Sequence, residues 1–217
     1  MKTRLAVTLL TTLIATSAQA WQAGDVVVRA GAAGVMPTGD GTVYPAAGTT
    51  PAGKVEADDA WSLGVSLTYM ATNNIGVGVL GAWPFKHDIN GKDDLAAAGT
   101  VAETKQLPPT VTLQYHFDTG SNLHPYAGIG VNYTTFFDTK TKGALTGTDL
   151  DLGSSWGLAG ELGVDYELQN NWLVGAQVFY MDIDTDAKIS GAGAPLDGTH
   201  TVSIDPWAVM VSVGKKF

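Results

Sequence analysis

The stretch Trp172-Leu-Val-Gly-Ala-Gln-Val-Phe-Tyr-Met181 decides the fold. Every second residue from Trp172 to Tyr180 is apolar, and an aromatic ring stands at each end of this set. The residues between them include Gly175 and Gln177, so the opposite set has a different character. Alternation with a period of two residues is typical of a β-strand whose two faces meet different surroundings. The stretch therefore predicts a strand that separates an apolar environment from a mixed one.

The same alternation recurs along the chain and predicts eight strands in total. Four more are clear, at 61–70, 110–117, 126–133 and 156–168, and three are weaker, at 25–33, 75–83 and 207–217. Three connections are short, and four are long and polar, at 36–59, 86–105, 138–154 and 182–201. Short turns on one rim and long loops on the other are typical of outer-membrane barrels, whose long loops are extracellular.

The tryptophans distinguish a membrane barrel from a soluble one. Five of the six lie at strand ends on the apolar set, four at the long-loop rim and Trp172 at the short-turn rim. Aromatic rings favour the lipid–water interface, so a spanning barrel carries two aromatic girdles. A soluble lipocalin-like barrel would turn its apolar face inward instead. The predicted fold is all-β: an eight-stranded antiparallel transmembrane β-barrel with short periplasmic turns and four long extracellular loops.

The composition agrees with strands that have one apolar face. The chain has 217 residues, of which 45% are hydrophobic, 15% are charged and 27 are glycine, whereas an ordinary soluble domain is about 25% charged. It has no cysteine, which excludes a disulfide scaffold, a thiolate metal site and a cysteine nucleophile. A formal net charge of −9 argues against a nucleic-acid partner, because such a protein needs a basic face.

Residues 1–20 have the pattern of a secretory signal peptide. Lys2 and Arg4 precede an apolar run, and Ala18-Gln-Ala20 is a cleavage site of the small-x-small type. We expect cleavage near Ala20, which would leave a barrel of residues 21–217 and, by removing two cations, lower the formal charge from −9 to −11. Export and a barrel fold together predict the outer membrane of a Gram-negative bacterium.

The alternation along each strand, and the distance of a residue from the two rims, predict which side chains fill the lumen and at what level. Near the long-loop end the inward positions are apolar, namely Leu80, Phe136, Phe179, Met181 and Met210. At mid-height and below they are polar or charged, namely Arg29, Gln114, His116, Glu161, Asp165 and Lys216. An apolar pocket with a few polar groups is the usual form of a small-molecule site, whereas a small barrel can also fill its interior by plain packing. The sequence predicts an apolar pocket above a polar plug, with plain packing as the alternative.

Several stretches, spread in order along the chain, form a specific set. They include Thr68-Tyr-Met-Ala-Thr72, Leu107-Pro-Pro-Thr110, Asn132-Tyr-Thr-Thr-Phe-Phe-Asp138, Tyr180-Met-Asp-Ile-Asp-Thr185 and Asp205-Pro-Trp207. The set resembles the OmpW family of small outer-membrane proteins. The resemblance implies an eight-stranded barrel that helps small hydrophobic molecules cross the outer membrane. It also implies that Leu80 and Phe179 lie where a hydrophobic channel is constricted.

We therefore expect a channel for passive uptake of small hydrophobic molecules through the apolar pocket. A charged plug would stop such molecules from passing straight through, so a sideways exit through the wall is expected. Proline cannot donate to a strand ladder, and prolines mark the upper strand ends at Pro84, Pro108, Pro109 and Pro206. These prolines either weaken the wall or simply end the strands. The alternative is a structural or receptor barrel with a plugged lumen, because members of the resembling family are also known as bacteriocin receptors and stress-responsive surface antigens.

The expected partners follow from the membrane setting. They are small hydrophobic molecules, outer-membrane lipid and lipopolysaccharide, and the barrel assembly machinery, whose signal the terminal Phe217 resembles. No motif predicts catalysis, a metal or a cofactor. Gly76-x-Gly-x-x-Gly81 matches the dinucleotide fingerprint, but a proline follows where a helix is required. His116 can approach Glu161 or Asp165 in the lumen as a candidate general base, but no serine lies beside it.

Overall fold

The computed structural model describes residues 21–44, 53–191 and 198–217. The predicted signal peptide, residues 1–20, and its cleavage near Ala20 lie outside the described residues. None of the helices formed by the described residues is long and apolar enough to cross a membrane.

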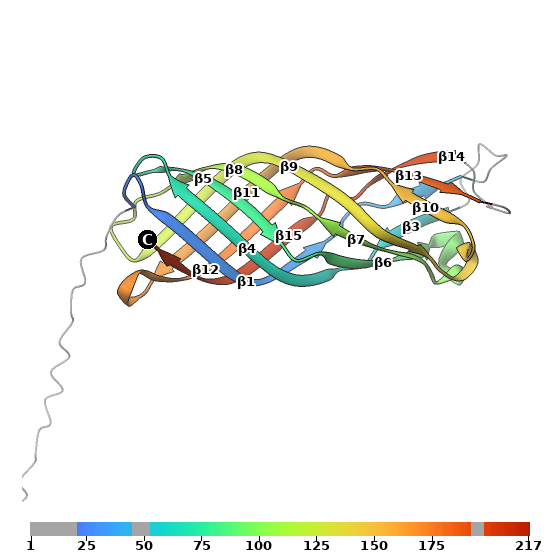
Figure 1. Ribbon diagram of the computed structural model, residues 1–217, viewed down its shortest axis with the longest axis horizontal. Coiled ribbons are helices and arrows are strands. Elements are labelled where there is room, and N and C mark those ends of the chain that lie inside the picture. Colours follow the sequence, from blue (N-terminus) through green and yellow to red (C-terminus); the bar gives the residue numbers. More distant parts are fainter. Residues whose placement is uncertain (1–20, 45–52, 192–197) are drawn as a thin grey trace, which may run out of the picture.

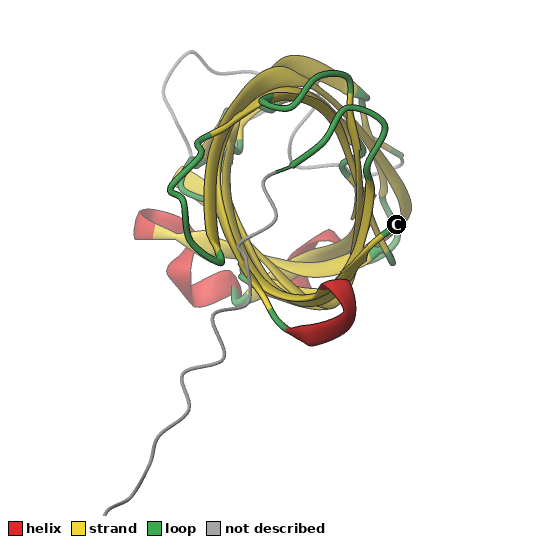
Figure 2. Cartoon of the chain, turned by 90° about the vertical axis from the view of Figure 1, so that its left-hand side faces the viewer, coloured by secondary structure: helices red, strands yellow, loops and turns green. Residues whose placement is uncertain are grey.

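Eight antiparallel strands close into a barrel, which confirms the predicted fold (Figures 1 and 2). In order around the ring they are β1 (Val26–Met36), β4 (Ala60–Met70), β5 (Ile75–Ala82), β8 (Thr110–His116), β9 (Leu123–Thr141), β11 (Ser155–Glu167), β12 (Trp172–Met181) and β15 (Trp207–Lys216). The ring closes where β1 pairs with β15, from Val27 opposite Lys216 to Met36 opposite Trp207. Closure leaves no free edge, which a strand in lipid cannot tolerate because its backbone polar groups would lack partners.

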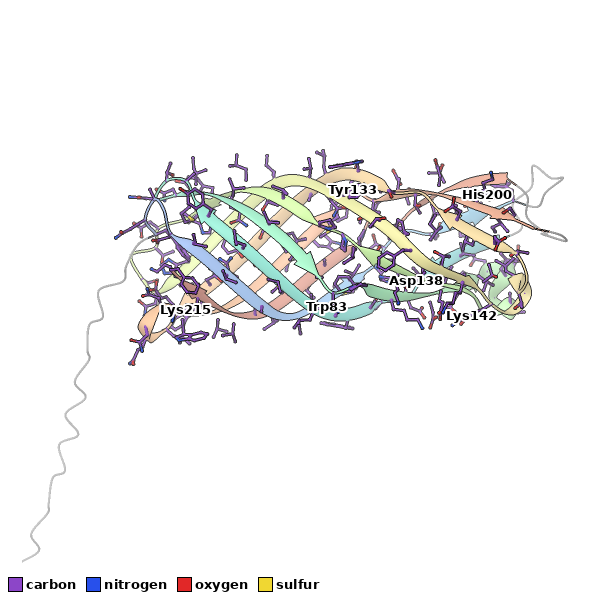
Figure 3. The ribbon with its side chains drawn as sticks, in the orientation of Figure 1. Trp83, Tyr133, Asp138, Lys142, His200 and Lys215 are labelled. Atoms are coloured by element: carbon purple, nitrogen blue, oxygen red, sulfur yellow. The ribbon has the colours of Figure 1, made fainter. Side chains whose placement is uncertain are left out.

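The two faces of the barrel wall differ as the alternation predicts. The outward set is apolar and exposed, and it carries one aromatic girdle near each end of the wall (Figure 3). Trp61, Trp83 and Trp156 of the upper girdle are 65%, 69% and 74% exposed. A monomeric soluble protein does not expose so broad an apolar band. The band therefore faces lipid, with the short turns on the periplasmic side.

The four connections predicted as long polar loops are mostly strands, which corrects that expectation. They form β2 (Gly41–Val43), β3 (Gly53–Ala57), β6 (Phe85–Lys92), β7 (Thr100–Leu107), β10 (Asp149–Leu152), β13 (Asp184–Ser190) and β14 (Gly198–Ser203), with short 3-10 turns η1 (Asp93–Ala98) and η2 (Gly143–Leu145). β9 continues upward and pairs with β7, and β6 and β3 continue that sheet. β14 lies beside β2 and β10 beside β9, so these strands extend the barrel wall outward. We call this extension the collar.

The collar forms because its short strands have apolar residues at alternate positions. Val101, Leu145 and Ile189 are buried together, and Val55, Ile89, Ala98 and Leu150 pack against them. Burying these side chains inside a paired wall satisfies the backbone polar groups and removes apolar surface from water. On the opposite rim the turn η3 (Gln169–Asn171) connects β11 and β12, with Asn170 and Asn171 at φ of 58° and 62°. Asparagine tolerates this left-handed conformation better than most residues.

Candidate functional site

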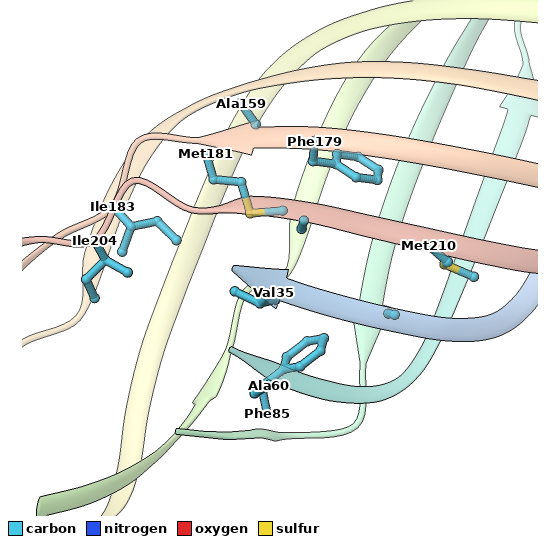
Figure 4. Packing of buried hydrophobic residues seen from close by; sticks show 11 residues of the cluster. Val35, Ala60, Phe85, Ala159, Phe179, Met181, Ile183, Ile204 and Met210 are labelled. Carbon is cyan, nitrogen blue, oxygen red and sulfur yellow. The ribbon is translucent and has the colours of Figure 1, made fainter. Parts of the chain in front are cut away.

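The upper half of the lumen is an apolar chamber (Figure 4). The structure places all five predicted apolar residues in it, because each stands on the inward face of its strand. Phe179, Met181 and Met210 are 2%, 1% and 2% exposed. Leu80 and Phe136 are partly buried and pack against the same cluster. Leu80, Phe179, Met181 and Met210 fill most of the chamber and leave only a narrow gap between them. The lining of this gap contains no charged residue.

A larger cavity lies above the chamber, inside the collar. With its open mouth it is about 940 Å³. Its wall is mainly apolar and contains Val55, Ile89, Val101, Leu150, Ile189 and Val202. Phe136 and Ile204 border this cavity and also belong to or pack against the apolar cluster of the chamber. An apolar surface therefore continues from the extracellular end of the collar down to Phe179.

One polar pair in the cavity wall, His87 and Gln106, is held by hydrogen bonds. The His87 ring donates from Nδ1 to the carbonyl oxygen of Asp58 at 2.6 Å and accepts at Nε2 from the amide of Gln106 at 3.0 Å. Burial lowers the pKa of His87, which lies outside the membrane-spanning wall. The His87 ring is therefore neutral at pH 7.

An ion pair closes the lumen below the chamber. Arg29 on β1 donates to Asp165 on β11 through two hydrogen bonds, Nε to Oδ1 at 3.0 Å and Nη2 to Oδ2 at 2.5 Å. A third donation, from Nη1, goes to the hydroxyl of Thr68 at 2.9 Å. Both charged side chains are fully buried. A Cβ atom at Gly175 would lie 2.4 Å from Asp165 Oδ1, so glycine leaves the room that this carboxylate occupies.

Glu161 is the second buried carboxylate of the plug. It accepts hydrogen bonds from Thr112 at 2.6 Å, from Gln114 at 2.8 Å and from Gln177 at 3.2 Å. Buried polar groups are tolerated when their hydrogen bonds are made. This network and the ion pair beside it form a continuous polar layer across the barrel. Apolar solutes in the chamber above therefore meet fixed charges and amides beneath them.

His116 lies in the lumenal polar plug, as predicted, and does not meet a carboxylate. Its Nε2 atom lies 3.1 Å from Gln114 Oε1, and its ring stacks on Tyr126 with centroids 4.8 Å apart. None of the hydrogen bonds between described residues joins His116 to Glu161 or Asp165. The general-base arrangement is absent because Gln114 occupies the position between the ring and Glu161. Lys216, the last predicted plug residue, lies lower and pairs with Glu167 at 3.1 Å.

Two lumenal aromatic residues escaped the sequence analysis. Tyr126 is 2% exposed, and its ring occupies the space left by Gly163, where a Cβ atom would lie 2.2 Å from the ring. Tyr126 lies on the same face of β9 as Gly128, and this alternation could have predicted that its ring points into the lumen. Trp21 is 3% exposed and meets His116 and His124 edge-on, at centroid distances of 5.3 and 5.1 Å. Trp21 precedes the first strand, so no alternation could place it.

Trp21 covers the plug from the periplasmic side. It packs with Val27, Met70 and Leu173, and the Lys216 ammonium lies 5.3 Å from its ring centroid. The backbone around it is anchored, since Gly24 donates to the carbonyl of Met70 at 2.8 Å and Ala23 to the side chain of Asn73 at 3.0 Å. The indole therefore acts as the lowest layer of the plug.

Replacing Trp21 by alanine is expected to open the plug to water from the periplasmic side. Met70 is fully buried beside Trp21, and the chain has no natural cysteine, so Met70→Cys provides a single reporter thiol. We expect a charged, membrane-impermeant thiol reagent to modify it at least ten times faster when Trp21→Ala is added. Trp172→Ala at the lipid-facing surface of the same rim is the control and should leave the rate unchanged. A reporter that reacts equally fast with Trp21 present would contradict this role.

The fold and site define an outer-membrane β-barrel with an apolar upper lumen, a polar plug below and exposed aromatic girdles. The OmpW family model matches residues 22–217. The chain belongs to the OmpW family and to the outer membrane, as the sequence motifs predicted. It is 44% identical to outer membrane protein W of Salmonella typhi over 96% of this chain and 95% of that protein.

Solved structures agree with this assignment. The crystal structure of the outer membrane protein OprG from Pseudomonas aeruginosa has a TM-score of 0.83 at 40% identity, covering 91% of this chain and 97% of that one. The solid-state NMR structure of outer membrane protein AlkL in DMPC bilayers has a TM-score of 0.71 at 26% identity, covering 100% of this chain and 97% of that one. Both support the barrel fold of an outer-membrane protein.

Proposed function

We propose that this barrel is a channel for passive uptake of small hydrophobic molecules from outside the cell. The observation that carries the proposal is the continuous apolar lining from the collar to Phe179, above a sealed polar layer. Moving an apolar group from water into such a lining gains about 0.8 kcal/mol per buried methylene group. A solute would therefore enter the collar down its own concentration gradient, without an energy source.

The polar plug makes straight passage into the periplasm unfavourable. An apolar solute would have to separate Arg29 from Asp165 and strip the hydrogen bonds from Glu161. Uncompensated burial of a charge costs several kcal/mol, and an apolar solute offers no compensation. This argument favours an exit from the chamber through the wall into the membrane.

A break in the wall supports a lateral exit between β5 and β8. The last ladder pair is Leu80 opposite Thr110, and pairing resumes only where Phe85 on β6 faces Gln106 on β7. Among the described residues, Gly81 and Ala82 have no ladder partner on β8, because Pro108 and Pro109 stand there. Proline lacks the N–H group that a ladder needs. The apolar chamber reaches Gly81 and Pro108, so it borders the break.

The other two prolines at the upper rim do not mark comparable breaks. The carbonyl of Pro206 accepts a hydrogen bond from Met181 at 3.2 Å, so β12 and β15 remain joined there. Next to Pro84, Trp83 donates to the carbonyl of Leu63 at 2.8 Å and joins that segment to β4. Of the four prolines considered from the sequence, only the pair at 108–109 supports a lateral exit.

Restoring donors at this break is expected to slow uptake. The assay uses a small apolar dye that fluoresces only in phospholipid. We expect this dye to enter cells that display the barrel faster than it enters cells that lack the barrel. The double substitution Pro108→Val with Pro109→Val lets the strands pair across the break, so the entry rate should fall several-fold. Pro206→Val, in a part of the rim that is already joined, is the matched control and should keep the rate. An unchanged rate in the double variant at equal surface amounts would rule out this exit.

A structural or receptor barrel with a plugged lumen is the second candidate function. The tightly bonded layer formed by Arg29, Asp165 and Glu161 favours it, since such a layer would also hold a purely structural barrel together. The two functions differ in whether uptake depends on the chamber. We propose no catalytic step, because His116 is engaged by Gln114 and Tyr126. Among the described residues no group of three or more His, Asp or Glu side chains could hold a metal ion.

A further inference from the structure

Four of the collar lysines lie together on one wall, in a chain whose formal charge is −9. They are Lys86 on β6, Lys105 on β7, Lys140 on β9 and Lys142 directly after β9. Their side chains are between 41% and 71% exposed, so they point away from the lumen. We call this surface the lysine wall. Figure 3 shows Lys142 and Asp138 on it, farther from the short turns than Trp83 and Tyr133.

Strand register sets the height of the lysine wall. Lys86 stands opposite Lys105, which stands opposite Phe137, and Glu103 in the next outward row stands opposite Lys140. Along the strands, the row of Lys86 and Lys105 is about 10–13 Å above the girdle rings Trp83 and Tyr133, at about 3.3 Å per residue. Lys140 and Lys142 lie farther up, and their ammonium groups meet Glu103 together with that of Lys86. Strand tilt shortens that height, and each headgroup layer of a bilayer is about 5–8 Å thick. Lysine stems are long and flexible, so the ammonium groups of the lower row, Lys86 and Lys105, reach the headgroup layer.

The carboxylates on the wall hold the ammonium groups in place without matching their number. Glu103 alone is approached by Lys142 at 2.6 Å, Lys86 at 2.9 Å and Lys140 at 3.9 Å. The hydrogen bonds from Lys142 and then Lys86 lower the pKa of Glu103 to about 2, so it stays ionised. Lys105 pairs with Asp138 at 2.9 Å, and Lys142 also meets Asp88 at 3.3 Å. Four cations thus face three carboxylates.

The collar strands β10 and β13, which follow β9 around the ring, have the reverse charge. The outward positions of β10 and β13 are exposed and carry Asp149, Asp151, Asp184 and Asp186, with Lys188 as the one cation among them. Cations are therefore concentrated on the β6–β7–β9 side of the molecule. Surface charges more than a Debye length apart, about 10 Å at 0.1 M salt, are largely screened from each other. An anion at the lysine wall would therefore interact mainly with the nearby lysines and little with the net negative charge of the chain.

We propose that the lysine wall binds the phosphate groups of lipopolysaccharide in the outer leaflet. The inference rests on the outer-membrane location of the barrel and does not depend on uptake. Phosphate monoesters carry close to two negative charges, and lysine is a common partner for them. Trp83 and Phe137, on the same face, offer apolar surface to the acyl chains and sugars below and beside the phosphates. The wall lies directly above the break between β5 and β8, so a bound molecule would border the proposed exit.

The test measures binding of deep-rough lipopolysaccharide with both lipid A phosphates to the folded barrel in neutral detergent micelles. Removing four charges, in Lys86→Gln, Lys105→Gln, Lys140→Gln and Lys142→Gln together, is expected to weaken binding at least tenfold in 0.1 M salt. The control removes three lysines that lie off the β6–β7–β9 wall, with Lys54→Gln, Lys188→Gln and Lys215→Gln, and should change binding less than twofold. Heat-modifiable migration in gels confirms that both variants are folded.

Further arms separate phosphate recognition from other causes. Glu103→Gln removes the carboxylate that competes for three of the lysines, so it should tighten lipopolysaccharide binding several-fold. This variant tests the proposal through a gain of binding, which misfolding cannot imitate. Lipopolysaccharide without its phosphates should bind at least tenfold more weakly than the native form, and inorganic phosphate should not compete at millimolar concentration. Equal binding of the dephosphorylated form, equal loss of binding in the lysine-wall variant and the control variant, or full competition by inorganic phosphate would each overturn the proposal.

Discussion

Replacing Asp165 by asparagine is expected to lower the free energy of unfolding by about 3–5 kcal/mol, the usual cost of breaking a buried ion pair. Asp165 accepts two hydrogen bonds from Arg29, and both side chains are completely buried in the plug. An amide has nearly the same shape as a carboxylate, but it carries no charge. Arg29 would remain buried and charged, with the hydroxyl of Thr68 and one amide oxygen as acceptors in place of a carboxylate. Equilibrium unfolding by denaturant in lipid vesicles measures the change.

Two comparisons make this result specific to the buried charge. Asp138→Asn makes the same chemical change in the exposed pair with Lys105, and asparagine also accepts the φ of 52° found there. It should cost less than about 1 kcal/mol. Arg29→Gln combined with Asp165→Asn removes both charges and should recover much of the loss. If Asp165→Asn is no more destabilising than Asp138→Asn, the plug is not held by this ion pair.

The sequence predicted the inward residues because alternation was unambiguous on the long strands. Phe179 and Gln177 share one face of β12, and Asp165 lies on the inward set of β11, so their lumenal positions followed from parity. Parity could not predict which inward side chains meet. Arg29 and Asp165 stand on β1 and β11, which are not neighbours in the ring, so their contact depends on register and strand tilt. Register and tilt likewise decide that His116 meets Gln114 and not a carboxylate.

The collar was missed for a different physical reason. Its strands, such as Gly53–Ala57 and Asp149–Leu152, have only a few residues each, with charged side chains on the outward face. A short alternating run surrounded by glycine, threonine and aspartate has the composition of a loop. These strands are stabilised by each other across long sequence distances, as Val101 and Ile189 are. Trp21 was missed because it enters the lumen from a segment with no strand periodicity.

Replacing Phe179 by arginine is expected to reduce uptake of an apolar molecule at least tenfold. Phe179 is buried between the collar and the plug, in the cluster that contains Met181 and Met210. A guanidinium there would keep water around itself, since removing an unpaired charge from water costs far more than an apolar solute gains by entering. It would also fill the space through which the solute reaches the break between β5 and β8. Phe179→Leu keeps an apolar side chain and should keep uptake within about twofold of the original, since a smaller apolar residue leaves the lining apolar.

The most direct test of the proposed function is the initial rate at which cells take up the apolar dye, measured for the barrel, Phe179→Arg and Phe179→Leu. Surface amounts are matched by the heat-modifiable folded form, so that a folding defect is not counted as a transport defect. The proposed path predicts that Phe179→Arg falls to the rate of cells without the barrel, whereas Phe179→Leu stays close to the original. A folded Phe179→Arg barrel that takes up the dye at the original rate would contradict passage through the apolar chamber and favour a structural or receptor role.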